Sequence, residues 1–393
     1  MLTSPSIQWF TPIEIAPLPT AIAGRYGDRI LTLGSCFSEH IGEHVRHLGY
    51  DVLVNPYGTL YNPISICDTL EDLLRNEQHR PDYTPYIIER DGLYYSLRHH
   101  SAIYGESLEE AQEATAQLWH TAHSRLAEAD WLWITLGTTQ VYYLRLLQKS
   151  TVSQSCLQDC PDFAERMKRK ALRVRSEGSI PPYVTEAESR KQHSDSPLCN
   201  SLYLAEGGRA VANCQQLPAR LFDRRDLPLD LLQERMLETL AQLLEQHPLQ
   251  VVLTVSPVRY LQDGLAESNL SKSKLRILCD TLCRELPACH YFPAYEILHD
   301  ELRDYRFYAR DLTHPSEEAI DYIADHFVAY WANQEPREVE MRQAAQRLRK
   351  LSQHRPKTPH GAERLEAQIA ERIAHYQEQY GEKLCIPSII ESL

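Results

Sequence analysis

The chain has 393 residues, of which 43% are hydrophobic and 24% charged, a composition typical of a globular protein with a large core. Its 54 acidic and 41 basic residues give a formal net charge of −13. Because the phosphates of nucleic acids require a basic surface, this charge argues against a nucleic-acid partner.

The first residues lack the basic start and the continuous apolar run of a secretory signal. No window has the length and apolarity of a membrane-spanning helix, so we expect a cytoplasmic protein without a membrane span. The ten cysteines are then expected to be reduced thiols. The spacings of Cys156 and Cys160, and of Cys279 and Cys283, match no zinc-binding motif, so no metal site is expected.

Strands alternate with helices along the first half of the chain. Residues 29–34 are predicted to form a buried strand, and residues 131–136 are a continuous apolar run, the pattern of a strand that is covered on both faces. Asp91-Gly92 favours a tight hairpin turn, because both central residues of such a turn need positive φ. The elements predicted in chain order are strand 29–34, helix 38–48, strand 51–55, helix 63–76, a hairpin over 86–97, helix 107–128 and strand 131–136.

The second half continues the alternation, and Ser316 is predicted to cap a helix that ends near Trp331. Strands that alternate with helices predict an α/β fold with a parallel sheet covered on both faces. The elements predicted here are helix 229–246, strand 251–255, helix 268–286, strand 289–292, helix 294–303 and helix 316–331.

Four segments with turn residues or reactive side chains each follow a predicted strand. Because the carboxyl ends of parallel strands meet at one edge of a sheet, we expect these segments to converge on one site. The segments are 34–36, 55–58, 137–140 and 254–257.

Residues 147–203 are interpreted as a polar insertion. Six basic residues lie within 166–175, which is unusual in an acidic protein. The simpler interpretation is a solvated helix face, and the alternative is a lid or a contact for an anionic ligand.

The tail from Pro336 onward predicts two amphipathic helices that are broken at Pro356 and Pro359. We expect these helices to pack either on the core or on a second subunit, and the second case predicts a homo-oligomer. The predicted domains are therefore 1–333 and a C-terminal helical extension over 334–393.

The sequence contains the groups of a nucleophilic triad. Ser35 and Cys36 lie on the strand-to-helix turn after Gly34, and Asp311 and His314 are three residues apart near the other end. A histidine can accept the proton of the nucleophile, and a carboxylate can fix the tautomer of that histidine. The alternative interpretation is that Asp311 only caps a turn and that Cys36 is a small buried residue.

Ser35 and Cys36 both remain candidates for the nucleophile. The Cys36 thiol ionises more readily than the Ser35 hydroxyl, especially near a helix N-terminus and a histidine. The oxyanion needs N–H donors, and the candidates are Cys36 itself, Gly58 and the turn from Gly137 to Thr139. Any tight turn requires glycine, so the two glycines are weakly specific.

Eight short stretches within residues 29–333 share the signature of a known family. They are Gly34–Ser38, Asn55–Pro63, Thr135–Thr139, Val211–Cys214, Thr254–Pro257, Pro293–Glu296, Arg303–Tyr308 and Asp311–Ser316. With these stretches the chain resembles the GSCFA family, a branch of the SGNH (GDSL-like) hydrolase superfamily. The resemblance implies a three-layer α/β/α sandwich with a five-stranded parallel sheet and a small β-hairpin, into which residues 147–203 are inserted.

The resemblance also implies roles for single residues. Cys36 stands at the nucleophile position of the superfamily, and Ser35 stands at the position of the Asp in its Gly-Asp-Ser elbow. Thr139 stands where the superfamily has an asparagine that donates to the oxyanion, and Gln140 follows it.

Two further positions depart from the family pattern. Ser38 stands where the family signature has alanine, and Gln215 stands where a histidine usually follows the Asn-Cys pair. Asn213 is the asparagine of that pair and is a candidate for binding substrate.

The function expected from this resemblance is an acyl hydrolase or acyltransferase that acts on the O-acyl ester of a small molecule or glycan, such as a cell-envelope precursor. Cys36, or Ser35 in the alternative register, would attack and form a covalent acyl-enzyme, with His314 as the base and Asp311 as its orienting group. No metal or organic cofactor is required. The alternative is a binding module that has lost catalysis. The residues expected at the oxyanion and substrate are Gly58, Gly137, Thr139, Gln140 and Asn213.

Overall fold

The computed structural model of the chain describes residues 11–144 and 209–386, so the predicted insertion at 147–203 lies outside the described residues. The chain divides into two compact units. The larger consists of Met1–Arg80, Gln117–Thr139 and Leu227–Leu393, and the smaller of Pro81–Ala116 and Gln140–Asp226.

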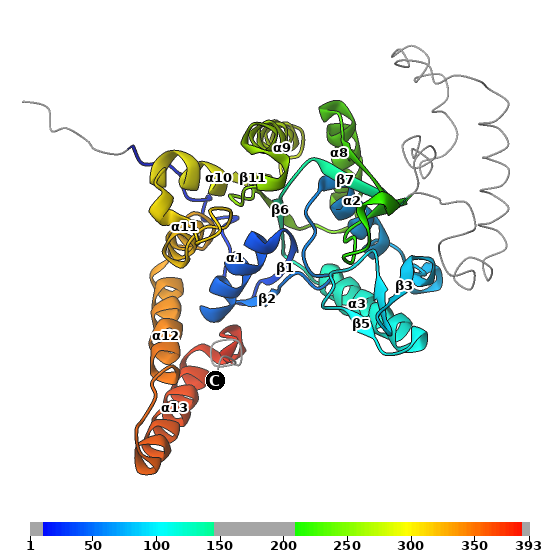
Figure 1. The fold of residues 1–393 in the computed structure, drawn as a ribbon. Helices are drawn as coiled ribbons and strands as arrows, with labels where there is room; N and C mark the ends of the chain where they lie inside the picture. The colour runs from blue at the N-terminus through cyan, green and yellow to red at the C-terminus, as the bar shows by residue number, and fades with distance from the viewer. Residues whose placement is uncertain (1–10, 145–208, 387–393) are drawn as a thin grey trace, which may run out of the picture. The chain divides into compact units, whose positions relative to one another are not determined.

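The larger unit is built on a five-stranded parallel sheet with the strand order β11-β10-β6-β1-β2 (Figure 1). This confirms the predicted α/β fold. The register places Gly34 opposite Thr135, and Thr135 opposite Thr254, at the carboxyl edge of the sheet. The strands are β1 (Arg29–Gly34), β2 (Asp51–Leu53), β6 (Trp131–Leu136), β10 (Gln250–Val255) and β11 (Cys289–Phe292).

Helices α1 (Cys36–His47) and α11 (Glu317–Trp331) pack together on one face of this sheet. Trp133 of β6 contacts Phe327 and Trp331 of α11 edge to face, with ring centroids 4.7 and 4.9 Å apart. Ser316 caps α11 as predicted, because its hydroxyl accepts a hydrogen bond from the N–H of Ala319.

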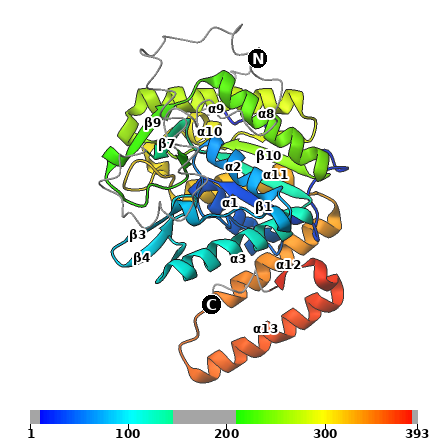
Figure 2. The ribbon, with the colours of Figure 1, turned by 90° about the vertical axis from the view of Figure 1, so that its right-hand side faces the viewer.

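Helices α12 (Pro336–Ser352) and α13 (Pro359–Tyr380) form an antiparallel pair at the C-terminal end of the described chain (Figures 1 and 2). Met341 and Leu348 of α12 and Tyr376 of α13 are buried in the same apolar cluster as α1 and α11. The expectation that these helices pack on the core is therefore confirmed. Their packing on a second subunit stays a prediction.

The opposite face of the sheet is covered by α2 (Pro63–Leu73), α8 (Leu229–Gln246) and α9 (Leu265–Glu285). Successive residues of a strand point to opposite faces of the sheet. Leu31 and Leu253 alternate with the strand residues that face α1 and α11, and both are fully buried on this side. The three helices pack in the order α2, α8, α9. Helices on both faces of the parallel sheet are compatible with a three-layer sandwich.

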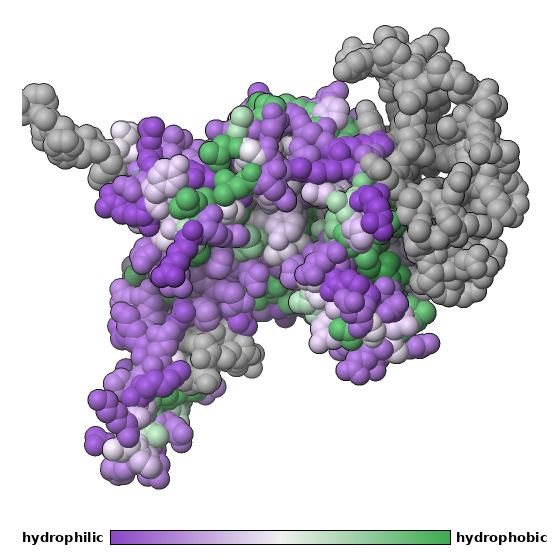
Figure 3. All heavy atoms as spheres, viewed as in Figure 1, coloured by the Kyte–Doolittle hydropathy of each residue, from purple (hydrophilic) through white to green (hydrophobic). Residues whose placement is uncertain are grey.

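The surface of the larger unit is mostly hydrophilic, with apolar surface around α9 (Figure 3). Its exposed apolar side chains at α9 and the turn before it are Leu261, Leu265, Leu270 and Ile277. In the part of the chain that the structure describes, no helix is both long and apolar enough to cross a membrane.

The smaller unit contains two three-stranded antiparallel sheets, in the orders β3-β4-β5 and β8-β7-β9. The predicted hairpin is confirmed, since Asp91 and Gly92 join β3 to β4 with φ values of 56° and 81°. The strands are β3 (Ile87–Arg90), β4 (Leu93–Ser96), β5 (Tyr104–Gly105), β7 (Gln140–Leu144), β8 (Arg209–Val211) and β9 (Phe222–Asp226). Helix α3 (Leu108–Ala127) contributes residues to both units.

The predicted helix over 294–303 differs from the structure. It begins as α10 (Ala294–Glu296) and continues as the π-helical turn Ile297–Leu302, which ends at Arg303 with a φ of 48°. The widened turn carries Glu301, whose buried carboxylate accepts hydrogen bonds from the N–H of Ile13 at 2.8 Å and from the hydroxyl of Tyr322. The hydrophobic periodicity of the sequence does not predict the π-helical turn, because both hydrogen bonds of Glu301 are tertiary contacts.

Candidate active site

The turn between β1 and α1 has a backbone shape that only glycine fits. Gly34 has a φ of 151°, and a Cβ atom added there would lie 2.4 Å from the carbonyl oxygen of Thr135. The next N–H, that of Ser35, donates to the same carbonyl at 3.1 Å. The end of β1 is thus tied to β6 at the point where the chain turns into α1.

Ser35 and Cys36 differ in access. Ser35 is fully buried, and its hydroxyl has no hydrogen-bond partner among the described residues. Cys36 is the first residue of α1 and is partly exposed. Of the two candidate nucleophiles, Cys36 is therefore the one that a substrate can reach.

Several groups shift the pKa of the Cys36 thiol in opposite directions. Burial raises its pKa, whereas the N–H groups of Phe37 and of Cys36 itself and the positive charge of Lys272 lower it. Glu39 on the same helix raises the pKa slightly further, and the net direction is upward. Formation of the Cys36 thiolate therefore depends on the hydrogen-bond donors and positive charge that the surrounding groups provide.

Asp311 and His314 form the hydrogen-bonded pair that the sequence predicts as an orienting acid and a base. The Nδ1 atom of His314 lies 2.6 Å from Oδ2 of Asp311. Because an ionised carboxylate can only accept, Nδ1 carries the proton, and Nε2 of the neutral ring is left as a proton acceptor. The interaction with His314 is the largest cause that lowers the pKa of Asp311, to about 2.

Asp311 also shapes the backbone around it. Its Oδ1 atom accepts from the N–H groups of Thr313 at 2.9 Å and His314 at 3.0 Å, while Leu312 takes a φ of 56°. Asp311 therefore caps this turn, as the simpler interpretation holds, and binds the histidine ring as well. The two interpretations are not exclusive.

The Asp311–His314 turn is fixed to the carboxyl edge of the sheet through Arg259. The N–H of Arg259, four residues after β10, donates to the carbonyl oxygen of Thr313 at 3.0 Å. The guanidinium carbon of Arg259 lies 3.9 Å from the centroid of the Tyr308 ring, which holds the segment before the turn. Arg259 is thus a positioning residue that its isolated place in the sequence did not reveal.

His40 is a partly buried histidine of α1. It lies one helical turn after Cys36, on the same face of α1. Burial lowers the pKa of His40. Within residues 11–144 and 209–386, no hydrogen bond joins His314 directly to Cys36.

The N–H groups that the sequence suggested as oxyanion donors are used inside the protein. That of Gly58 donates to the carbonyl oxygen of Asn55 at 2.7 Å, and that of Gly137 donates to the carbonyl oxygen of Tyr61 at 2.8 Å. In this structure these two groups shape turns and do not point to a substrate.

Thr139 is also engaged internally. Its N–H and its hydroxyl lie 2.9 and 3.1 Å from the hydroxyl oxygen of Ser271 on α9. The remaining candidate donors at the elbow are the N–H groups of Cys36 and Phe37 in the first turn of α1. A developing oxyanion next to the Cys36 thiol would meet these donors.

Lys272 of α9 is a functional candidate that the sequence analysis missed. It is 2% exposed, and its Nζ atom donates to the carbonyl oxygens of Gly137 at 2.6 Å and Ser256 at 2.7 Å. Burial lowers its pKa to about 7, and only the charge of Cys36 opposes this shift. A signal was present, since Lys272 falls on the apolar stripe that Leu275, Leu278 and Leu282 continue.

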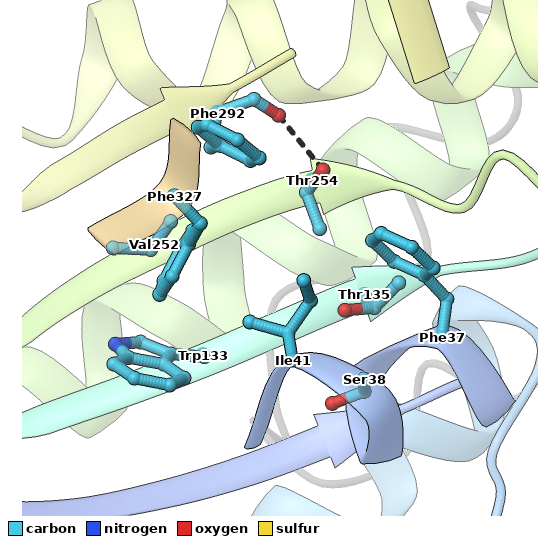
Figure 4. Close-up of a pocket in the computed structure, with 9 residues that line it drawn as sticks. All are labelled: Phe37, Ser38, Ile41, Trp133, Thr135, Val252, Thr254, Phe292 and Phe327. Carbon is cyan, nitrogen blue, oxygen red and sulfur yellow. Dashed lines mark hydrogen bonds between the residues drawn. The ribbon is translucent and has the colours of Figure 1, made fainter. Parts of the chain in front are cut away.

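A small cavity lies between α1 and the sheet, and Phe37, Ser38 and Ile41 of α1 line it (Figure 4). Ser38, which stands where the family signature has alanine, lines this cavity together with Thr135 of β6 and Thr254 of β10. Thr254 donates its hydroxyl to the carbonyl oxygen of Phe292 at 2.7 Å. The remaining lining residues are apolar.

Gln140 and Asn213 belong to the smaller unit. Gln140 begins β7, and the side-chain oxygen of Asn213 accepts from the N–H of Gln215 at 2.7 Å. The side-chain amide of Gln215 donates to the carbonyl oxygens of Ser96 and His99, both at 2.8 Å. Asn213 therefore shapes the backbone where Gln215 is bound.

The comparisons with known proteins agree with the sequence motifs. A family model described as the GSCFA family matches residues 29–179 and 200–327, which include Cys36, Lys272, Asp311 and His314. No curated protein and no solved structure matches the chain. Among the described residues, no group of three or more His, Cys, Asp or Glu side chains is placed to hold a metal ion. The family match covers most of the chain, and the protein belongs to the GSCFA family.

Proposed function

We propose that this protein is an SGNH-type acyl hydrolase or acyltransferase that acts on an O-acyl ester of a small molecule or glycan, in the cytoplasm. The observation that carries the proposal is the Asp311–His314 pair, whose hydrogen bond at Nδ1 leaves Nε2 of the histidine as a proton acceptor. This combination of nucleophile, base and orienting acid is that of acyl-transfer enzymes.

In the proposed reaction, Nε2 of His314 accepts the proton of the Cys36 thiol, and the sulfur attacks the acyl carbon. The N–H groups of Cys36 and Phe37 stabilise the tetrahedral oxyanion. The alkoxide leaves with the proton from His314, and a thioester remains on Cys36. Water or a second alcohol, deprotonated by His314, then accepts the acyl group. The hydrogen bond between a nucleophile and its base is often longer in a free enzyme than in its substrate complex.

Hydrolysis of 4-nitrophenyl acetate by purified variants tests the proposal. We expect Cys36→Ala and His314→Ala to lower kcat/KM by at least roughly a hundredfold, and Ser35→Ala to retain most activity. His40→Ala is the matched control, since it removes a neighbouring histidine that bonds no carboxylate in the described part of the chain. Equal loss in His40→Ala and His314→Ala would contradict the assignment of His314 as the base.

A binding module without catalysis is the second candidate function. The observation that favours it is the internal use of the N–H groups of Gly58, Gly137 and Thr139. It predicts that wild type and His314→Ala react with the ester at the same slow rate. That result would replace the enzyme proposal with this one.

A further inference from the structure

The backbone of His314 is tied to the segment that precedes the Asp311–His314 turn. The carbonyl oxygen of His314 accepts a hydrogen bond from the N–H of Ala309 at 2.8 Å, and Tyr308, the residue before Ala309, forms a β-bridge with Pro315. The side chain of Tyr308 is buried, so the surrounding packing fixes its place. A movement of Tyr308 would therefore move the backbone of His314 as well.

The hydroxyl of Tyr308 is bound by His299, which lies on the π-helical turn Ile297–Leu302. The Nδ1 atom of His299 lies 3.2 Å from the hydroxyl oxygen of Tyr308, and its Nε2 atom lies 3.2 Å from the carbonyl oxygen of Pro257. Because a carbonyl oxygen can only accept, Nε2 carries the proton, and Nδ1 accepts from the Tyr308 hydroxyl. One imidazole ring thus joins the segment after β10 to the segment that leads into the Asp311–His314 turn.

Both side chains have the protonation state that these two hydrogen bonds require. Burial lowers the pKa of His299 to about 4, and the nearby charge of Arg259 also disfavours the imidazolium, so the ring is neutral near pH 7. Burial raises the pKa of Tyr308 to about 12, so its hydroxyl keeps the proton that it donates. A neutral imidazole can donate at one nitrogen while it accepts at the other.

The π-helical turn gives His299 a firm support. Two residues further along this turn, the buried carboxylate of Glu301 accepts hydrogen bonds from the N–H of Ile13 and from the hydroxyl of Tyr322. Turns of this type are rare and occur frequently at functional sites. The turn is therefore held by contacts of its own, and His299 can transmit its position to Tyr308.

Arg259 makes a second connection between the same two segments. Its N–H donates to the carbonyl oxygen of Thr313 at 3.0 Å, and its guanidinium carbon lies 3.9 Å from the centroid of the Tyr308 ring. Pro257 lies two residues before Arg259 on the segment that follows β10. This segment and His299 therefore hold Tyr308 at its ring face and at its hydroxyl.

We propose that His299 is a positioning residue that fixes Tyr308 through its two hydrogen bonds and, through Tyr308, fixes the Asp311–His314 turn at the carboxyl edge of the sheet. The inference rests on the proposed function, in which Nε2 of His314 accepts and returns the proton. In that reaction His299 touches neither the substrate nor the reacting atoms. Its contribution is the placement of His314, and small displacements of a reacting group are costly.

The kinetics of 4-nitrophenyl acetate hydrolysis test this role with a conservative and a disruptive variant. His299→Leu removes both hydrogen bonds, whereas the amide of His299→Gln retains a donor and an acceptor. We expect His299→Leu to lower kcat/KM by about tenfold or more, and His299→Gln to stay within about threefold of wild type. The matched control is His290→Leu on β11, whose ring lies 2.9 Å from Oε1 of Gln250 and which should retain full activity.

A double-mutant cycle tests whether His299 acts through Tyr308. Tyr308→Phe removes only the hydroxyl and should also lower kcat/KM, and the double variant with His299→Leu should lose no more than His299→Leu alone. Losses that multiply in the double variant would mean independent effects and would overturn the inference. Because Tyr308→Phe deletes a single oxygen atom, its folded form gives a result even where His299→Leu does not fold.

Hydrogen exchange followed by mass spectrometry measures the same role without any substrate. We expect His299→Leu to accelerate exchange in the segment 305–316 by about fivefold or more, while His299→Gln and His290→Leu exchange as wild type does. Unchanged exchange in this segment in folded His299→Leu, or equal acceleration in His290→Leu, would contradict the role of His299.

These outcomes are distinguishable from failure of the proposed function. Faster exchange in His299→Leu, together with a wild type that hydrolyses no ester, would keep the anchor of the turn and reject the enzyme. Hydrolysis that depends on His314 but is unchanged in folded His299→Leu and Tyr308→Phe would keep the enzyme and reject the positioning role.

Discussion

At the scale of single residues, the account depends on how Asp311 holds His314. The carboxylate binds the ring at Nδ1 and two backbone N–H groups of its own turn, and these bonds lower its pKa to about 2. Because the folded-state pKa is depressed, the stabilisation by Asp311 is present above its ordinary value of 3.8 and is lost as the pH falls through about 2. At neutral pH the carboxylate is always available to orient the histidine.

Asp311→Asn is predicted to lower the rate of acyl transfer by roughly a hundredfold or more, because an amide can no longer fix the Nδ1–H tautomer of His314. The effect is measured as kcat/KM on the same ester, with the iodoacetamide reactivity of Cys36 as a check of the nucleophile. Asp304→Asn, an exposed aspartate in the preceding segment, serves as the control. Equal activities of Asp311→Asn and wild type would refute the role of Asp311.

At the scale of elements, the β1–α1 turn decides where the nucleophile lies. Gly34 permits the close approach to Thr135, and α1 begins at Cys36, so the thiol comes to the carboxyl edge of the sheet at the first turn of a helix. First-turn N–H groups and the positive end of the helix favour an anion at that place. The geometry of the turn therefore supports both packing and chemistry.

Gly34→Ala is predicted to reduce the free energy of unfolding by about 3 kcal/mol, because the new Cβ meets the Thr135 carbonyl in a conformation that favours glycine. Urea unfolding monitored by tryptophan fluorescence measures the loss. The control is Gly381→Ala, which has a φ of 64° but no atom within 4 Å of the added Cβ. It should cost only about 1 kcal/mol. Similar losses in the two variants would contradict the steric argument.

At the scale of the whole molecule, much of the fold was predictable because it depends on local pattern. The sequence pattern predicted β1 and β6 at their observed bounds, and the positions of Pro356 and Pro359 predicted the break between α12 and α13. The site was only partly predictable. The Asp311–His314 bond follows from their spacing, whereas the internal partners of the Gly137 and Thr139 N–H groups, Tyr61 and Ser271, come from contacts far apart in the sequence.

The C-terminal helices are predicted to contribute to the stability of the larger unit itself. Leu348 of α12 is fully buried in the cluster that includes α1 and α11, so Leu348→Ala should cost about 3 kcal/mol in unfolding free energy. The half-buried Leu351 on the same helix is the matched control and should cost less than about 1 kcal/mol. If Leu348→Ala altered only the mass in solution, measured by light scattering, and left unfolding unchanged, the helix would be an oligomer contact.

The central claim is that Cys36 carries the acyl group and that His314 is needed to load it. The most direct test is intact-mass analysis of the full chain, quenched with acid seconds after mixing with 4-nitrophenyl acetate, followed by peptide mapping. The account predicts one acetyl group on Cys36 in wild type and in Ser35→Ala, and none at this position in Cys36→Ala or His314→Ala. An acetyl group on Ser35, or an adduct on Cys36 that forms equally fast without His314, would contradict it.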